Sequence, residues 1–383
     1  MADKFMKSIT FVEGGDQYYP LPKVTNADDG KVLKVVDGKW SVMDPIPTTY
    51  LSFIGNKDFG LKTVYDTKNW DGTLEYSTDT ITWRTWDGTE ISSVGNKLYL
   101  RGIGNTKITG DPEQFSMYNF HFVVDNPYNT IISCEGNIEN LLDYETVIAG
   151  GHPTMADYCF AGLFIGCISL AKAPELPATT LTNGCYMYMF NGCMLLQTAP
   201  ALPATILAGA CYTGMFYGCM FLETAPALPA TTLTALCYAY MFYDCTSLTT
   251  APALPATILA TGCYNSMFQG CTALTTAPEL PSTTLAENCY DSMFEGCTSL
   301  TTAPALPATT LATGCYLEMF KDCTKIKLSA TQTGEYQTAY RIPTTGTGTT
   351  ATDSLTNMFT NTGGTFTGSP SVNTTYYTSN TVV

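Results

Sequence analysis

The sequence predicts a multidomain protein with a β-rich N-terminal region, an α/β solenoid of 26-residue repeats and a β-rich C-terminal cap. Cysteines return at a fixed interval between residues 159 and 323. Of the 383 residues, 45% are apolar and 13% are charged, so the chain can form a packed core but has a surface poor in charge. The net charge is −15, and the charged residues are unevenly distributed, because most Lys and Arg residues precede residue 150.

The repeat has the consensus CYxxMFxxCxxLxxAPxLPATxLxxx, and we number its first cysteine position 0. One such unit cannot bury its own apolar face, whereas units side by side bury a continuous one, so a solenoid is predicted. The first cysteine of the copies is Cys159, Cys185, Cys211, Cys237, Cys263, Cys289 and Cys315, and the second is Cys167, Cys193, Cys219, Cys245, Cys271, Cys297 and Cys323.

Each copy is expected to contain one short helix and one short strand. The apolar residues of CYxxMFxxC are spaced by four and five, which predicts a helical turn. The next segment, CxxLxxA, predicts a strand of a parallel ladder, and the proline after it ends the strand because proline cannot donate to a central ladder. Neighbouring copies should then lie about 5 Å apart on the strand side.

The repeat resembles the leucine-rich repeats of BspA-like bacterial surface proteins, as in MFEGCTSLTTAPALPATTLA from Met293 to Ala312. The resemblance covers residues 157–330 and implies adhesion, binding of protein or glycan, and no catalysis. Residues 115–144, ending in SCEGNIENLLDY, are similar to the segment that caps such arrays, and residues 47–110 are similar to a β-sandwich often attached to them.

The expected domains follow from these segments. They are an attachment segment with a β-hairpin (1–45), a β-sandwich-like domain (46–114), an N-terminal cap (115–158), the leucine-rich-type solenoid (159–330) and a Thr/Gly-rich C-terminal cap (331–383). The last segment contains SLTNMFTNTGGTF, which repeats the Met-Phe motif once more. A polar, atypical last unit is what an array needs to cover its final apolar face.

The N-terminal segment TNADDGKVLKVVDGKWSV alternates apolar and polar residues around Asp29–Gly30 and Asp37–Gly38, which predicts a β-hairpin. It is similar to the N-terminal segments of phage head-fibre and other virion fibre proteins. That similarity implies attachment to a capsid or other virion protein, and a possible homotrimer. The attachment candidates are Leu33, Val35, Val36 and Trp40. An ordinary hairpin in a small domain is the alternative.

The favoured function is a non-enzymatic phage virion structural protein, a head fibre or decoration protein that displays the solenoid to a host or mucosal surface glycan or protein. The N-terminus has no signal-peptide pattern, which favours synthesis in a host cytoplasm and assembly into a virion. The alternatives are a BspA-like adhesin on a bacterial cell surface and a phage tail receptor-binding protein. A virion-bound glycan hydrolase is the least favoured class.

The fifteen cysteines allow three interpretations. A disulfide framework needs an oxidising compartment and leaves one cysteine unpaired. A metal site would need short spacings or nearby histidines, which the repeat lacks. The favoured interpretation is a column of small buried thiols, with the Met-Phe pairs also in the core.

We expect no catalytic residue, no metal and no cofactor. His121 and His152 are the two histidines, and neither accompanies a nucleophile motif. His121 lies in an apolar strand pattern and is interpreted as structural. From Cys185 to Gly314 there is no Lys, Arg or His, so this part cannot clamp phosphates, and nucleic acid is not an expected partner. No window is apolar enough to predict a membrane span, and no membrane partner is expected.

Positions +2, +3 and +6 of the repeat vary between copies, so they are expected to be exposed. In three consecutive copies they include Tyr188, Tyr217, Tyr240 and Tyr243, and Phe221 stands at a strand-side position. Exposed aromatic side chains offer large, stiff, amphipathic contact surface. The hypothesis is that these five residues bind the host-surface partner, and the alternative is drift on a solvated face.

Overall fold

The computed structural model describes residues 32–36, 39–43, 50–110, 119–343 and 353–379. The chain divides into two compact units, Met1–Thr49 and Tyr50–Val383. Strands and turns dominate the described residues of the second unit, and the strands form several separate sheets. Within the described ranges, the one helix is α1 (Asn140–Ile148). These strands agree with the predicted β-rich character of the N-terminal region and of the C-terminal cap.

In the first unit, β1 (Val32–Val36) pairs antiparallel with β2 (Lys39–Met43), and Val36 lies opposite Lys39. This antiparallel pairing agrees with the predicted β-hairpin. Asp37–Gly38 and Asp29–Gly30 lie outside the described residues, as do the side chains of the attachment candidates Leu33, Val35, Val36 and Trp40.

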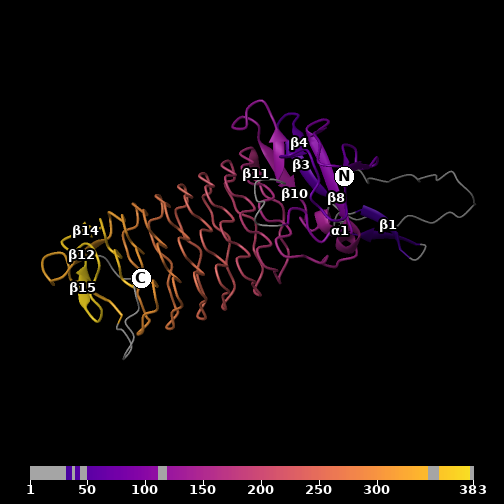
Figure 1. Ribbon diagram of the computed structural model, residues 1–383. Coiled ribbons are helices and arrows are strands. Elements are labelled where there is room, and N and C mark those ends of the chain that lie inside the picture. The colour runs from indigo at the N-terminus through magenta and orange to yellow at the C-terminus, as the bar shows by residue number, and fades with distance from the viewer. Residues whose placement is uncertain (1–31, 37–38, 44–49, 111–118, 344–352, 380–383) are drawn as a thin grey trace, which may run out of the picture. The chain divides into compact units, whose positions relative to one another are not determined.

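The second unit begins with two sheets, which we call the N-terminal sheets (Figure 1). The larger has the strand order β11-β10-β3-β8-β5-β6, and the smaller has the order β7-β4-β9. Their strands are β3 (Leu51–Gly55), β4 (Gly60–Thr63), β5 (Thr73–Ser77), β6 (Arg84–Trp86), β7 (Ile91–Ser92), β8 (Lys97–Ile103), β9 (Phe120–Val123), β10 (Ile132–Glu135) and β11 (Leu170–Lys172).

Aromatic side chains join the two N-terminal sheets. The ring of Phe53 on β3 lies 5.6 Å from that of Phe122 on β9, and the ring of Trp86 on β6 lies 5.4 Å from that of Phe120. Phe53, Phe120 and Trp86 are all buried. Helix α1 packs closely on β8, because a Cβ at Gly102 would collide with the backbone carbonyl of Leu141. These strands come from both sides of residue 114, where a domain boundary was predicted.

The predicted helix at the start of each copy is wrong, because this segment is a series of turns. Every fourth residue has a left-handed backbone, with φ of +57° at Gly184, +53° at Tyr188 and +72° at Gly192. A right-handed helix cannot pass through such residues. The apolar spacing of four and five therefore reflects a chain that turns at each left-handed residue.

Backbone N–H groups that would stabilise a helix donate to the next copy instead. The amides of Tyr186, Phe190 and Gly192 donate to the carbonyls of Cys211, Met215 and Tyr217 at 3.0, 2.9 and 2.8 Å. The same alternation recurs in the following copies. Successive copies thus lie side by side, and Figure 1 shows residues 159–330, here called the repeat array, as a succession of adjacent turns.

The predicted strand of each copy is reduced to single bridges in the middle of the repeat array. Parallel bridges join Thr198, Thr224, Thr250, Thr276 and Thr302 in sequence. Each bridging threonine precedes the proline of its copy by two residues, consistent with proline ending the pairing. The strands β11 and β12 (Lys327–Ser329) lie at the two ends of the repeat array.

Two columns of stacked rings run through the core of the repeat array. Tyrosines at position +1, from Tyr186 to Tyr316, stack with centroids 5.7–5.9 Å apart. Phenylalanines at position +5, from Phe164 to Phe320, stack at 5.6–5.7 Å. Because each ring packs between its counterparts in the two neighbouring copies, the burial of one copy depends on both neighbours.

The cysteines form two further columns, and all fifteen thiols are free and buried. The second cysteine of a copy donates to the carbonyl of the preceding copy's phenylalanine, as Cys219 Sγ does to Phe190 O at 3.1 Å. Burial raises the pKa of Cys185 to about 12 and that of Cys263 to about 11, so these thiols stay protonated. This arrangement agrees with the buried-thiol interpretation.

A four-stranded sheet follows the last copy, in the order β13-β15-β12-β14. Its other strands are β13 (Thr338–Arg341), β14 (Gly363–Gly364) and β15 (Thr375–Thr378). Residues 354–359, which repeat the Met-Phe motif, take the place of a further copy. Phe320 donates its amide to Met358 and stacks on Phe359 at 5.4 Å.

Candidate binding strip on the repeat array

The structure brings four of the five predicted binding residues together. The rings of Tyr217 and Tyr243 are parallel within 4° at a centroid distance of 4.4 Å. Tyr240 lies 6.2 Å from Tyr243 at a tilt of 47°. Burial raises the pKa of Tyr188, and the proximity of Tyr240 and Tyr217 adds to that rise. We call Tyr188, Tyr217, Tyr240 and Tyr243 the tyrosine cluster.

The turn geometry of the repeat explains how these side chains meet. Tyr188 and Tyr240 stand at position +3, where φ is +53° and +57°. Gly214 holds the same position in the copy between them, and a Cβ there would collide with the Tyr188 ring. The glycine therefore leaves room for the Tyr188 ring to lie over the middle copy.

The prediction that positions +2, +3 and +6 are exposed is wrong. The four tyrosines are only partly accessible, and Thr213, Gly214, Ala239 and Ser266 at positions +2 and +3 are buried. Adjacent copies cover part of each other's surface. A repeat position whose residue type differs between copies can therefore still be half-buried.

Phe221 lies apart from the tyrosine cluster. It is 49% exposed, and the neighbouring Met220 is 43% exposed. Among the residues that the structure describes, no ring contact joins Phe221 to any of the four tyrosines. Phe221 thus remains a binding candidate by exposure but belongs to a different part of the surface.

Position +6 continues from the tyrosines into polar residues that the sequence-based hypothesis did not include. Gln269 Nε2 donates to Glu295 Oε2 at 2.7 Å, and Lys321 Nζ lies 2.9 Å from both Glu295 Oε1 and Glu318 Oε2. The hydrogen bond from Lys321 lowers the pKa of Glu318. The sequence carries the signal for this extension, because Gln269 and Glu295 occupy the variable position +6 of their copies.

We call the tyrosine cluster together with Gln269 and Glu295 the binding strip. It crosses five copies and presents phenol, amide and carboxylate groups. Burial raises the pKa of Tyr243, with Tyr217 and Asp244 adding to the rise, so this hydroxyl stays neutral far above physiological pH. The strip can exchange hydrogen bonds and make partly apolar contacts, but it holds no nucleophile next to a base.

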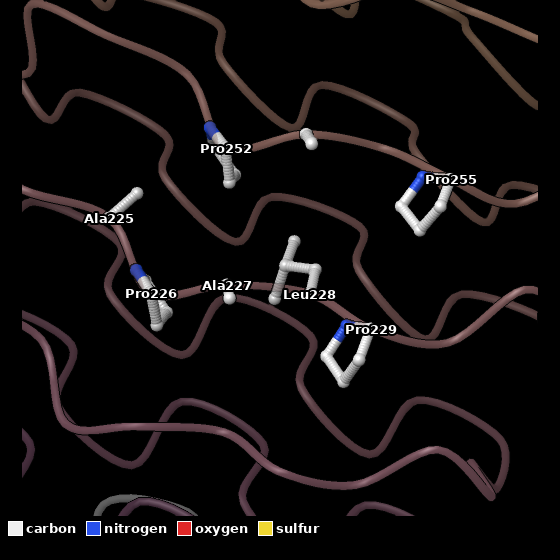
Figure 2. A pocket seen from close by; sticks show the side chains of 8 residues that line it. Ala225, Pro226, Ala227, Leu228, Pro229, Pro252 and Pro255 are labelled. Atoms are coloured by element: carbon white, nitrogen blue, oxygen red, sulfur yellow. The ribbon is translucent and has the colours of Figure 1, made fainter.

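A shallow apolar pocket lies elsewhere on the repeat array, between neighbouring copies (Figure 2). Pro226 and Pro252 occupy equivalent positions in adjacent copies, as do Pro229 and Pro255, and alanine and leucine side chains complete the lining. None of these side chains can donate or accept a hydrogen bond. The side chains that line the pocket therefore offer no polar group to orient a small ligand.

Two pairs of titratable side chains outside the strip make structural contacts. His152 Nδ1 lies 2.8 Å from Glu139 Oε2, and Glu139 is buried. Arg101 lies over Trp83 at 4.1 Å and binds Glu75 at 2.6 Å. His121 is on β9 as predicted, but its side chain is exposed. Among the described residues, no group of three or more His, Cys, Asp or Glu is arranged to hold a metal ion.

Comparison with protein-family models, with curated proteins and with solved structures gives no match to this chain. The resemblances to BspA-like repeats and to virion fibres therefore stay predictions. A search of the described helical residues finds no helix with the length and hydropathy needed to cross a bilayer.

Proposed function

We propose that the chain is a non-enzymatic structural protein of a phage virion, a head fibre or decoration protein. In this proposal the repeat array is a leucine-rich-type solenoid, held by a sandwich of the N-terminal sheets. The solenoid displays the tyrosine cluster to a glycan or protein on a host or mucosal surface. The N-terminal segment attaches to a capsid or other virion protein.

The solenoid is supported by contacts that recur from copy to copy. Backbone hydrogen bonds, stacked rings and hydrogen bonds donated by cysteine thiols each join one copy to the adjacent copy. An array of this kind is stiff and extendable, and its stability comes from nearest-neighbour interfaces. These properties suit a protein that holds a binding surface away from its point of attachment.

One observation carries the binding role: four tyrosines from three consecutive copies meet on an array whose middle copies have no cation. Stacking holds the rings in place before a partner arrives, so little side-chain entropy is lost on binding. Tyrosine is also among the residues that most often dominate binding energy at interfaces.

The adhesion test compares the full chain with a variant carrying Tyr217→Ala, Tyr240→Ala and Tyr243→Ala. Binding to mucin-coated surfaces and to bacterial cells should fall at least tenfold, while circular dichroism at 25 °C stays that of the parent. Tyr65→Ala is the matched control, because Tyr65 is 55% exposed and lies outside the repeat array. Equal adhesion of the folded triple variant and the parent would overturn the binding role.

Attachment is tested separately with particles in a density gradient. The full chain should band with the virions, and a chain with Val35→Asp and Trp40→Ala should stay in the soluble fraction. If the parent chain remains soluble or sediments with cell envelopes, the virion role is wrong and the bacterial adhesin is favoured.

A further inference from the structure

The stacking within the tyrosine cluster decides which ring surfaces a ligand can reach. Tyr217 and Tyr243 cover one face of each other at 4.4 Å, and the Tyr188 ring lies against Gly214. The four tyrosines are partly buried, so a ligand cannot cover both faces of these rings. Each ring also carries a phenol hydroxyl, which can both donate and accept a hydrogen bond.

The charge around the strip excludes acidic ligands. No Lys, Arg or His occurs from Cys185 to Gly314. Lys321, the cation at the polar end, is already paired with Glu295 and Glu318. A sialylated or sulfated glycan would thus find no free cation here, and Asp244 and Glu295 would repel it.

Backbone hydrogen bonds place the position +6 residues of successive copies in a row along the repeat array. Gly218, Asp244 and Gly270 donate their amides, each at 2.8 Å, to the position +6 carbonyls of the following copies. Tyr217, Tyr243, Gln269 and Glu295 thus succeed one another at the spacing of hydrogen-bonded chains, about 5 Å. A ligand that uses the whole line must itself be extended along the repeat array.

We infer that the binding strip takes an uncharged linear oligosaccharide, which lies along the repeat array and hydrogen-bonds to the phenol, amide and carboxylate groups of successive copies. This inference rests on the proposed function and names its ligand class. A sugar chain presents many hydroxyls without charge, which matches the donors and acceptors of the strip. A protein partner is the other outcome of the test, because tyrosine side chains also anchor protein interfaces.

The test uses the full chain and neutral linear oligosaccharides of glucose, mannose and N-acetylglucosamine, from two to eight units, beside sialylated and sulfated glycans. At least one neutral series should bind, with affinity rising with chain length, and the acidic glycans should not. Replacing the three hydroxyls by Tyr217→Phe, Tyr240→Phe and Tyr243→Phe keeps the stacked rings but should weaken binding at least tenfold. Tyr65→Phe should leave it unchanged.

The polar end provides a second readout. Gln269→Leu should weaken binding of the longest oligosaccharides and leave the shortest unaffected, since short chains fit on the tyrosines alone. Equal binding of acidic glycans, or full binding by the folded triple Phe variant, would overturn the inference. If the triple Ala variant loses adhesion but no neutral series binds the parent, the ligand inference fails while the binding role stands. If adhesion survives the triple Ala change, both fail.

Discussion

The repeat array and the N-terminal sheets bury their side chains in opposite ways. In the array, Phe216 stacks on Phe190 and Phe242, its counterparts in the two neighbouring copies, at 5.7 and 5.6 Å. In the sheets, β3 pairs with β10, so that Gly55 lies opposite Ile132. The array is therefore a sum of equal, local interfaces, whereas the sheets depend on a few distant pairings that must form together.

The largest expected difference between the two regions appears at alkaline pH. Burial raises the pKa of the array thiols above their ordinary value of 9.0, to about 12 in Cys185. Above pH 9 the unfolded chain loses these protons and the folded chain keeps them, so stability falls as pH rises. Each such thiol lowers the free energy of unfolding by more than about 1 kcal/mol for each pH unit above 9. Fourteen of the fifteen cysteines lie in the two columns, so the effect is repeated along the array.

Spectroscopy can follow the two regions separately in a Trp40→Phe variant. Its remaining tryptophans are Trp86 on β6 and Trp70 and Trp83 between the strands β4, β5 and β6, and the repeat array has no tryptophan. Between pH 9 and 11, we expect the array signal in circular dichroism to be lost while tryptophan emission still reports folded sheets. Loss of both signals at one pH would show that the regions unfold as a single unit. An array that keeps its signal through pH 11 would contradict the thiol argument.

Truncating a core side chain should cost a similar free energy of unfolding in the two regions, but the loss of hydrogen-exchange protection should spread over different distances. Phe216→Ala and Phe53→Ala each remove a fully buried ring, and each should cost about 3–5 kcal/mol. Urea unfolding measures the cost, and hydrogen exchange measures its reach. Protection should fall around Phe216 in adjacent copies only, but throughout the sheets after Phe53→Ala. A uniform loss along the array would show that its copies are not independent neighbours.

Two glycine substitutions make a finer comparison. Gly102→Ala should cost about 1–3 kcal/mol through overpacking, because its Cβ would collide with the Leu141 carbonyl. A Cβ at Gly218 would have no close neighbour, but φ of this residue is +68°. Gly218→Ala should therefore lower the free energy of unfolding only by the backbone strain, about 1 kcal/mol. Thermal unfolding of both variants checks the order. The reverse order would mean that the left-handed turns of the array are more demanding than the helix–sheet contact.

The sequence predicts the array better than the sheets for a physical reason. Periodic contacts repeat their signal in every copy, so the apolar phase of Tyr212, Phe216 and Cys219 identifies the core without any knowledge of distant pairings. The pairing of β4 with β9 across the intervening strands leaves no such signal. For that region the sequence predicts only its β-rich character, and for the first unit it predicts the β-hairpin.

The local path of the chain was harder to predict than its period. Apolar spacings of four and five suit a helix, but a left-handed residue at every fourth position suits only turns. Glycine marks that position at Gly184 and Gly192, whereas Tyr188 and Ala210 conceal it. The tyrosine cluster was found because its members vary against a constant background, and its half-burial was missed because exposure depends on the adjacent copy.

Removing one whole copy tests most directly whether each copy pairs with its neighbour in register. Deletion of residues 263–288 joins Gly262 to Cys289 in phase and leaves the tyrosine cluster intact. The shortened chain should fold with the parent's circular dichroism per residue and the same tryptophan emission. Deletion of residues 263–275 breaks the phase and should unfold the array. If both deletions unfold it, or both leave it folded, the register of adjacent copies does not determine this structure.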